Sequence, residues 1–271
     1  MQTENATKCG GRRLKGILAE GTTDRPLITV VTAVFNAFGT IEATIESVLG
    51  QTYGSVEYII IDGGSTDGTL DIIRKYEHAV DYWISEPDKG IYDAMNKGIR
   101  TSRGTWLNFL NAGDVFSNHS VLESIAKIYF CSDARFIYSD VLLSTGGRTV
   151  NNPPRVICDH KRLIINHQSS IYRKDLHFDH GMYLVAPGIT ISDYLFFSLV
   201  GQNDYLKADY AIAIYDTAGV SQLRKAVEQK IIVDYLINGM PRYKFFAYFH
   251  LYHYYRNAKA ALARLWRGRR S

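Results

Sequence analysis

The strongest constraint on the fold of this chain is a regular alternation of short apolar segments with amphipathic segments between residues 28 and 114. The apolar segments are rich in β-branched and large side chains, which indicates buried strands at 28–35, 56–61, 80–84 and 105–110. Helical periodicity lies between them, at 41–49, 70–76 and 91–99. Because strands that alternate with helices pair in parallel, this order predicts an α/β fold with a Rossmann-like, mostly parallel sheet flanked by helices.

The predicted strands lead into loops of polar and small residues, and the loop after 105–110 is the most informative. It reads Asn111-Ala112-Gly113-Asp114. In open α/β sheets, ligands bind beyond the carboxyl ends of the strands. A carboxylate beside a flexible glycine can hold a divalent cation there, and the cation can hold a diphosphate. The same residues are common in ordinary turns, so the composition of this loop alone leaves both interpretations open.

Composition places the chain among globular proteins with a sizeable core, since 46% of its 271 residues are hydrophobic and 21% are charged. No apolar run reaches the roughly 18 residues of a transmembrane helix, and the first residues lack the apolar region of a secretory signal. The three cysteines, Cys9, Cys131 and Cys158, are widely spaced and odd in number. We therefore expect a protein of the reducing cytosol, without a disulfide or zinc framework.

Charge is distributed unevenly along the chain. Residues 241–271 hold eight Lys or Arg and no Asp or Glu, so residues 1–240 hold 23 basic and 27 acidic residues. A mildly acidic body argues against nucleic acid as a partner. In a helix over 241–266, arginines would share one sector opposite leucines and aromatic residues, which predicts binding to an anionic membrane surface. The alternative is an amphipathic helix that packs on the domain with its basic face in solvent.

The chain divides into three predicted parts. Residues 1–25 are polar and glycine-rich, which predicts a mobile lead-in. Residues 26–218 form the main domain, and its second half is expected to hold a helix at 120–129, a strand at 135–143, a loop at 144–155 and a strand at 205–216. Residues 219–271 are expected to form two C-terminal helices, at 220–238 and 241–266.

Four segments resemble, in order, the motifs of the family 2 glycosyltransferases: 33–36, 61–69, 88–98 and 110–114. Two shorter matches follow at 167–168 and 192–194. The resemblance implies a GT-A-like fold with a nucleotide-sugar part at about 26–115 and an acceptor part at about 116–218. It also implies inverting transfer of a sugar from a nucleotide sugar, UDP-sugar above all, to a hydroxyl of a saccharide acceptor. The resemblance further implies a role in bacterial surface polysaccharide synthesis. The predicted membrane contact of the C-terminal segment would hold the enzyme at the inner face of the cell membrane, where lipid-linked saccharide acceptors lie.

The resemblance also assigns roles to residues. Asp193 would be the catalytic base, and Asp114 would hold a divalent metal, Mn²⁺ or Mg²⁺. His167 and Gln168 would lie on the acceptor side. The nucleotide sugar would contact Ala33, Phe35, Asn36, Asp62, Gly63, Ser65, Lys89, Asn96, Asn111, Ala112 and Gly113. Such a reaction needs a base for the acceptor hydroxyl and positive charge for the leaving diphosphate.

Structural roles compete with several of these assignments. Asp62 and Ser65 are also typical of a turn or a helix cap, Lys89 of a solvated surface, and Asp193 of a helix N-terminus. The Asp-x-Asp element of the family is reduced here to Asn111 and Asp114. Gly63 stands where the second motif commonly carries a second acid, which often touches the uracil ring.

Two other functional classes compete with a glycosyltransferase. A dehydrogenase is disfavoured because no Gly-x-Gly-x-x-Gly follows the first strand. A non-catalytic nucleotide-sugar-binding protein, or a membrane adaptor on the same fold, stays open as the alternative.

Overall fold

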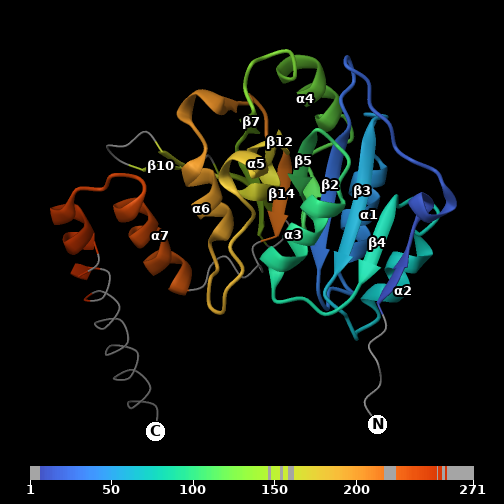
Figure 1. Cartoon of the computed structure of the whole chain (residues 1–271), viewed down its shortest axis with the longest axis horizontal. Coiled ribbons are helices and arrows are strands. Elements are labelled where there is room, and N and C mark those ends of the chain that lie inside the picture. The colour runs from blue at the N-terminus through green and yellow to red at the C-terminus, as the bar shows by residue number, and fades with distance from the viewer. Residues whose placement is uncertain are drawn as a thin grey trace, which may run out of the picture.

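A computed structural model describes residues 7–145, 148–152, 155–157, 162–216, 224–248, 250–251 and 254. Its centre is an eight-stranded sheet in the order β1-β4-β3-β2-β5-β12-β7-β13 (Figure 1). The bounds are β1 Lys8–Gly10, β2 Ile28–Val34, β3 Val56–Asp62, β4 Tyr82–Ser85, β5 Trp106–Phe109, β7 Phe136–Tyr138, β12 Ser170–Arg173 and β13 Tyr205–Lys207. Strands β4, β3, β2 and β5 are parallel, whereas β1 and β12 pair antiparallel with their neighbours. The predicted α/β class is confirmed, and the sheet as a whole is mixed.

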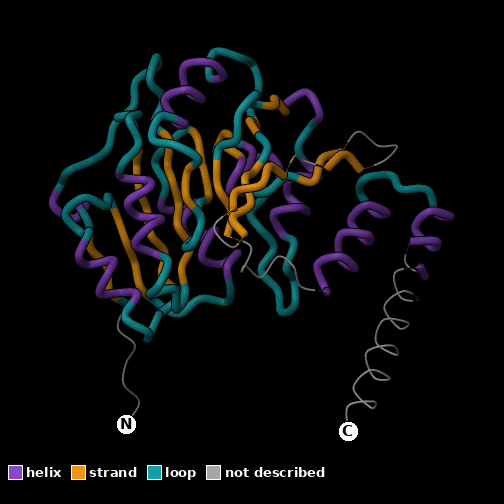
Figure 2. The backbone as a smooth tube through the Cα atoms, turned by 180° about the vertical axis from the view of Figure 1, so that it is seen from behind, coloured by secondary structure: helices purple, strands orange, loops and turns teal. Residues whose placement is uncertain are grey.

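Helices cover both faces of this sheet, as the view from behind also shows (Figure 2). Their bounds are α1 Ile41–Leu49, α2 Thr69–Lys75, α3 Ile91–Thr101, α4 Val121–Tyr129, α5 Leu176–His180, α6 Ser192–Leu199 and α7 Arg224–Leu236. Ile28 and Val30 of β2 pack with α1, α2 and α4, while Val31 and Ala33 pack with α3 and α6. Side chains alternate between the faces of a strand, so a strand covered on both sides is apolar throughout, as β2 is.

A four-stranded sheet lies beside the large one, in the order β6-β14-β8-β9. Its bounds are β6 Val115–Phe116, β8 Val141–Thr145, β9 Arg148–Asn152 and β14 Ala213–Asp216, and a separate ladder joins β10 Arg155–Ile157 to β11 Arg162–Ile164. Three predictions for this half are therefore wrong. The strand expected at 135–143 is β7 and β8, the strand expected at 205–216 is β13 and β14, and the expected loop contains β9.

The chain changes sheets at Ser139, which accounts for the first of these corrections. The Ser139 N–H donates to the Ser169 carbonyl, and its hydroxyl accepts from the Ile212 N–H. Both bonds join segments remote in sequence. The apolar pattern of 135–143 continues across this bend because both new strands are half-buried or buried, so local periodicity does not reveal the break.

The N-terminal segment is part of the fold, and the prediction of a lead-in is wrong for residues 8–15. Strand β1 pairs with the edge of β4, and the 3₁₀ helix η1 Arg12–Lys15 follows it. Arg13 then reaches the buried carboxylate of Glu57, at 2.5 Å. Edge pairing uses main-chain groups, so it needs no apolar pattern in the sequence.

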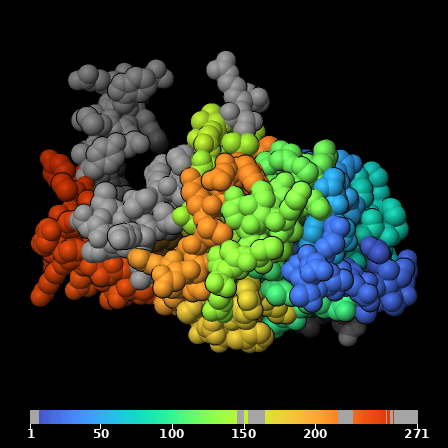
Figure 3. Space-filling model, turned by 90° about the horizontal axis from the view of Figure 1, so that it is seen from above, coloured from blue at the N-terminus to red at the C-terminus, as the bar shows by residue number. Residues whose placement is uncertain are grey.

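Helix α7 confirms the first predicted C-terminal helix and docks on α6. The Tyr194 hydroxyl donates to the buried Asp234 carboxylate at 2.5 Å, and the Asn238 side chain donates to the same carboxylate at 2.7 Å. Figure 3 shows the N-terminal segment at one end of the molecule and the C-terminal helices at the other. Residues 242–248 are also helical, while most of the predicted helix 241–266 lies outside the described residues. Within the described part of the chain, no helix is both long and apolar enough to cross a membrane.

Candidate active site

The topology brings the motif loops together beyond the carboxyl ends of the parallel strands of the large sheet. The chain runs from β2 to β3 and β4 on one side, and β5 then pairs on the other side of β2. The order of parallel strands thus reverses between β2 and β5. At such a switch point the loops diverge and leave a crevice at the carboxyl ends of the strands. The Ala112 N–H donates to the Ala33 carbonyl there, at 3.3 Å, so the first and fourth motifs lie side by side.

Hydrogen bonds join the loop after β2 to the loop after β3. Asn36 has a left-handed backbone, with φ of 48°, which asparagine tolerates better than most residues. Its N–H donates to the Ser65 hydroxyl at 2.8 Å, and its side-chain oxygen accepts from the Thr66 N–H at 2.9 Å. Asp67 accepts from the Phe38 N–H at 3.0 Å. The loops of the first two motifs are therefore held together by hydrogen bonds as one unit.

Asp62 stabilises this pair of loops through hydrogen bonds. It is fully buried, and its carboxylate accepts from the Ser65 hydroxyl at 2.5 Å and from the Ser85 hydroxyl at 2.6 Å. Ser85 lies at the end of β4 and was not among the predicted site residues. Asp62 thus acts on the site by fixing the loop around Ser65.

Helix α3 carries the third motif. Lys89 is exposed just before the helix, and its N–H donates to the Asp93 carboxylate at 3.0 Å. Asn96 is buried, and its amide group exchanges two hydrogen bonds with the main chain of Tyr183, at 2.8 and 3.0 Å. These bonds make Asn96 a structural link between α3 and the segment before α6, and we leave it out of the proposed ligand contacts.

The loop after β5 is tied to α1 through Thr44, which the sequence analysis missed. The Thr44 hydroxyl donates to the Asp114 carbonyl at 2.8 Å and accepts from the Gly113 N–H at 3.0 Å. Gly113 has a φ of 100°, which favours glycine. Asp114 itself is only 4% exposed.

A cation bound at this loop would need oxygen ligands from the substrate as well as from the protein. The side-chain oxygen of Asn111 is buried and has no hydrogen-bond partner among the described residues. An amide oxygen and a carboxylate on one loop suit Mg²⁺ or Mn²⁺, which often take one or two protein ligands plus phosphate oxygens. The described residues contain no group of three or more His, Cys, Asp or Glu that could hold a metal without such help.

Asn111, His167 and Asp193 form a chain of contacts across the crevice. The Asn111 amide nitrogen lies 2.8 Å from His167 Nε2, and His167 Nδ1 lies 3.0 Å from Asp193 Oδ2. If the amide donates to Nε2, the imidazole carries its proton on Nδ1 and donates it to the carboxylate. Asn108 holds this arrangement, because its amide donates to the carbonyls of Gln168 and Ser170. The predicted donor-side and acceptor-side residues thus meet.

Tyr92 is a further partner of Asp193 that the sequence analysis did not assign. Its hydroxyl donates to Asp193 Oδ1 at 2.7 Å, and the Tyr194 N–H donates to the same oxygen at 2.9 Å. Burial alone would raise the pKa of Asp193, but the hydrogen bond from His167, the positive charge of that imidazole when it is protonated, and the bonds from Tyr92 and Tyr194 hold this pKa below its ordinary value. Burial, together with the charge of Asp193, raises the pKa of Tyr92. Asp193 is therefore ionised and oriented at neutral pH.

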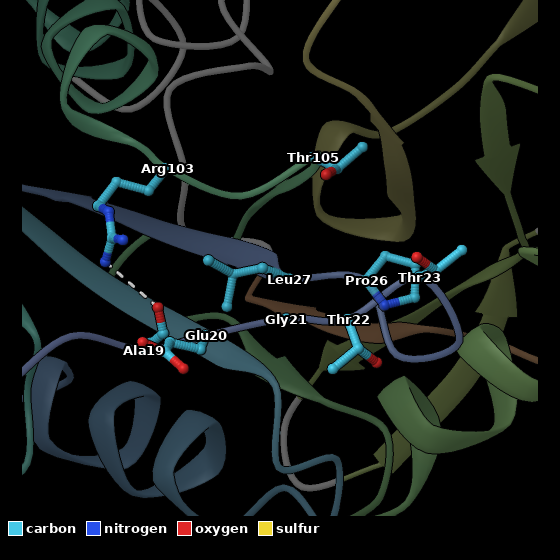
Figure 4. Close-up of a pocket in the computed structure, with 9 residues that line it drawn as sticks. All are labelled: Ala19, Glu20, Gly21, Thr22, Thr23, Pro26, Leu27, Arg103 and Thr105. Carbon is cyan, nitrogen blue, oxygen red and sulfur yellow. Dashed lines mark hydrogen bonds between the residues drawn. The ribbon is translucent and has the colours of Figure 1, made fainter.

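A cavity of about 540 Å³ lies away from the motif loops, at the amino ends of the parallel strands (Figure 4). Leu27 and Thr105 line it just before β2 and β5 begin, and Arg103 donates to the Ala19 carbonyl at 3.2 Å on its wall. Because the motif loops follow the carboxyl ends of the strands, this cavity at the amino ends is remote from the residues described above.

Comparison with known families is consistent with this geometry. Residues 29–183, more than half of the chain, match the sequence pattern of Glycosyl transferase family 2. The chain belongs to glycosyl transferase family 2. The resemblance noted in the motifs is thereby confirmed, and the matched region includes β2 to β12 with every motif loop up to Gln168.

Curated glycosyltransferases are similar to this chain over part of its length. An uncharacterized glycosyltransferase of Mycobacterium tuberculosis is 43% identical over 106 residues, 39% of this chain and 40% of its own length. The Escherichia coli protein WfaP, named as a UDP-Glc:α-D-GlcNAc-diphosphoundecaprenol β-1,3-glucosyltransferase, is 32% identical over 48% of this chain and 53% of its own length. The chain thus spans 40% and 53% of the length of these two relatives.

Two solved structures share the GT-A-like fold. Residues 1–349 of Staphylococcus aureus TarS, in complex with UDP-GlcNAc, superpose with a TM-score of 0.62 and 19% identity, over 78% of this chain and 65% of that chain. A mannosyltransferase of Pyrobaculum calidifontis in complex with GDP-Man and Mn²⁺ gives a TM-score of 0.55 and 16% identity, over 81% of this chain and 65% of its own.

Proposed function

We propose that this protein is an inverting glycosyltransferase that uses a nucleotide sugar, with UDP-sugar as the expected donor and a saccharide hydroxyl as the acceptor. The observation that carries the proposal is the position of Asp193. This ionised carboxylate is linked through His167, at 3.0 Å, to Asn111 at the carboxyl end of β5. A base on the acceptor side therefore faces the loop where the donor diphosphate is expected.

The chemistry follows from the free position on the carboxylate. A carboxylate has about four acceptor sites, and His167, Tyr92 and the Tyr194 N–H use three of those of Asp193. The remaining site accepts the proton of the acceptor hydroxyl. The hydroxyl oxygen then bonds to the anomeric carbon from the face opposite the nucleotide, and the bond to the diphosphate breaks with its electron pair on the diphosphate.

A divalent metal at Asn111 and Asp114 is a second part of the proposal. A bound Mn²⁺ or Mg²⁺ would neutralise charge on the leaving diphosphate. The buried, unpartnered oxygen of Asn111 and the adjacent carboxylate support this site. The Mn²⁺ complex of the structurally similar mannosyltransferase supports the choice of metal.

The acceptor is proposed to be a lipid-linked saccharide in bacterial surface polysaccharide synthesis, and the enzyme to act at the cytoplasmic face of the membrane. The acceptor in the printed name of WfaP carries a diphosphoundecaprenol lipid, which supports this class. Tyr243, Phe246 and Tyr248 are 46–70% exposed and lie in the basic C-terminal segment, which supports contact with an anionic membrane. The stacking of Phe245 on Tyr235 of α7, with ring centroids 4.4 Å apart, shows that part of this segment also packs on the protein.

A non-catalytic nucleotide-sugar-binding protein is the second candidate. The reduction of the Asp-x-Asp element to Asn111 and Asp114 favours it, since fewer carboxylates hold a metal less tightly.

A panel of nucleotide sugars tests both candidates. We expect the purified protein to hydrolyse one donor slowly and to transfer its sugar to an acceptor. The Asp193→Asn variant should still bind the donor nucleotide but transfer at least about a hundredfold more slowly. Asp71→Asn, on the exposed side of α2, is the control and should transfer normally. Absence of turnover with every donor, despite tight binding, would favour the binding protein.

A further inference from the structure

Gly63 is a glycine for reasons of space, not of backbone conformation. Its neighbour Gly64 has a φ of 83°, but Gly63 is not among the residues with a positive φ. A Cβ at Gly63 would lie 2.6 Å from Asp88 Oδ2 and 3.3 Å from the Phe35 ring. Real Cβ atoms do not approach other atoms that closely, so the Asp88 carboxylate occupies the space that a side chain at position 63 would need.

Asp88 is held in this position by its own loop. It lies between β4 and α3, half-buried, and its Oδ1 accepts from the Gly90 N–H at 2.8 Å. No described residue donates a hydrogen bond to Oδ2, the oxygen closest to Gly63. One oxygen thus anchors the side chain and the other is left for a donor from outside.

Phe35 provides an apolar surface beside this oxygen. It follows β2 at the switch point, and 63% of the residue is exposed, which is unusual for a phenylalanine at the end of a buried strand. A flat apolar surface and a single hydrogen-bond acceptor at a strand-end crevice suit a planar heterocycle that has one N–H on its edge.

We propose that Asp88 reads the nucleobase of the donor, with Oδ2 accepting the N3–H of uracil while the ring packs on Phe35. The acid that the second motif lacks at position 63 is thus supplied from the third motif. Uracil fits because its N3–H is a single donor, whereas guanine would offer two adjacent donors to one free oxygen. Cytosine has an acceptor at N3, which would repel the carboxylate. This inference rests on the proposed function, because it names the nucleotide of the donor.

Calorimetric binding of UDP, CDP and 3-methyl-UDP, each with Mn²⁺, tests the proposal. The wild-type protein should bind UDP at least about tenfold more tightly than CDP or 3-methyl-UDP, since both lack the N–H. The Asp88→Asn variant should lose most of this preference, because an amide can donate to cytosine N3. Asp71→Asn, a remote exposed site, should keep the preference.

Moving the acid from position 88 to position 63 tests whether the carboxylate itself restores UDP binding. Gly63→Asp alone should weaken UDP binding, because the new side chain meets Asp88. Gly63→Asp combined with Asp88→Gly should recover UDP binding and the UDP preference relative to Asp88→Gly alone.

The outcomes separate the two proposals. If wild-type protein binds no nucleoside diphosphate, the proposed function is overturned, and this inference with it. If wild-type protein prefers UDP and Asp88→Asn and Asp88→Gly keep that preference, only the role of Asp88 is overturned. A wild-type protein that binds UDP and CDP equally would also overturn the role of Asp88 while leaving glycosyl transfer in place.

Discussion

His167 and Asp193 are 26 residues apart in sequence, and their side chains meet with Nδ1 of the imidazole 3.0 Å from Oδ2 of the carboxylate. Tyr92, 101 residues before Asp193, donates to the other oxygen of the same carboxylate. The carboxylate is therefore oriented by one group from each half of the domain. A change in the position of α3 or of His167 would therefore act on the same carboxylate, which is the proposed base.

The pH dependence of transfer should reveal the contribution of Tyr92. Asp193 accepts a proton only when ionised, and hydrogen bonds including that from Tyr92 lower its pKa. Activity should therefore persist as the pH falls to the ordinary carboxyl range. Tyr92→Phe removes one of these bonds, so the pKa of Asp193 should rise and the acidic limb of the kcat/KM profile should move to higher pH.

A matched control for this prediction is Tyr53→Phe. The Tyr53 hydroxyl donates to the Pro26 carbonyl at 2.7 Å, remote from the site. That variant should lose a comparable hydrogen bond without any shift of the limb. A Tyr92→Phe profile that overlays the wild type would refute the coupling.

The effect of Mn²⁺ on UDP binding should depend on Asp114. Asp114→Ala should weaken UDP binding several-fold or more in Mn²⁺, because Asp114 would help to hold a cation that neutralises the charge of the diphosphate. In EDTA the variant and the wild type should bind UDP equally. Asp24→Ala, exposed in the N-terminal segment, should behave as wild type in both buffers. Equal binding by Asp114→Ala and wild type in Mn²⁺ would make Asp114 a turn residue.

Asn96 should matter for stability more than for ligand binding. Asn96→Ala leaves the buried N–H and C=O of Tyr183 without their partner. The free energy of unfolding should fall by about 2–4 kcal/mol, measured by urea denaturation. UDP affinity of the folded variant should stay within about twofold. Asn203→Ala, at an exposed position, should change neither quantity. A large loss of affinity without a loss of stability would instead assign Asn96 to the ligand.

The basic C-terminal segment should govern membrane association. A chain that ends at Gly239 keeps α7 and Asn238, and thus the contacts that hold α6. It should lose binding to anionic liposomes and turnover of a lipid-linked acceptor, because residues 241–271 hold eight basic and no acidic residues. Slow donor hydrolysis should remain. Equal liposome binding by the truncated and full chains would assign this segment a structural role.

The sequence by itself determined the family and the elements from β2 to β5. Apolar periodicity and polar residues at strand ends are local properties, so they can be recognised in the sequence alone. It could not predict β1, because an edge strand needs only main-chain groups from its neighbour. Nor could it separate β7 from β8, since both halves of that apolar run are half-buried or buried in different sheets.

Only the tertiary structure decided how the motif residues work. Asp62 and Asn96 have the residue types of a ligand site, but their partners are Ser65, Ser85 and the main chain of Tyr183. Hydrogen-bond partners far apart in sequence depend on how strands and helices are ordered in space. The pattern of residues therefore predicted where the candidate site lies, while the packing around it of α3, α6 and the 3₁₀ helix η2 (His167–Ser169) decided which side chains remain available to a substrate.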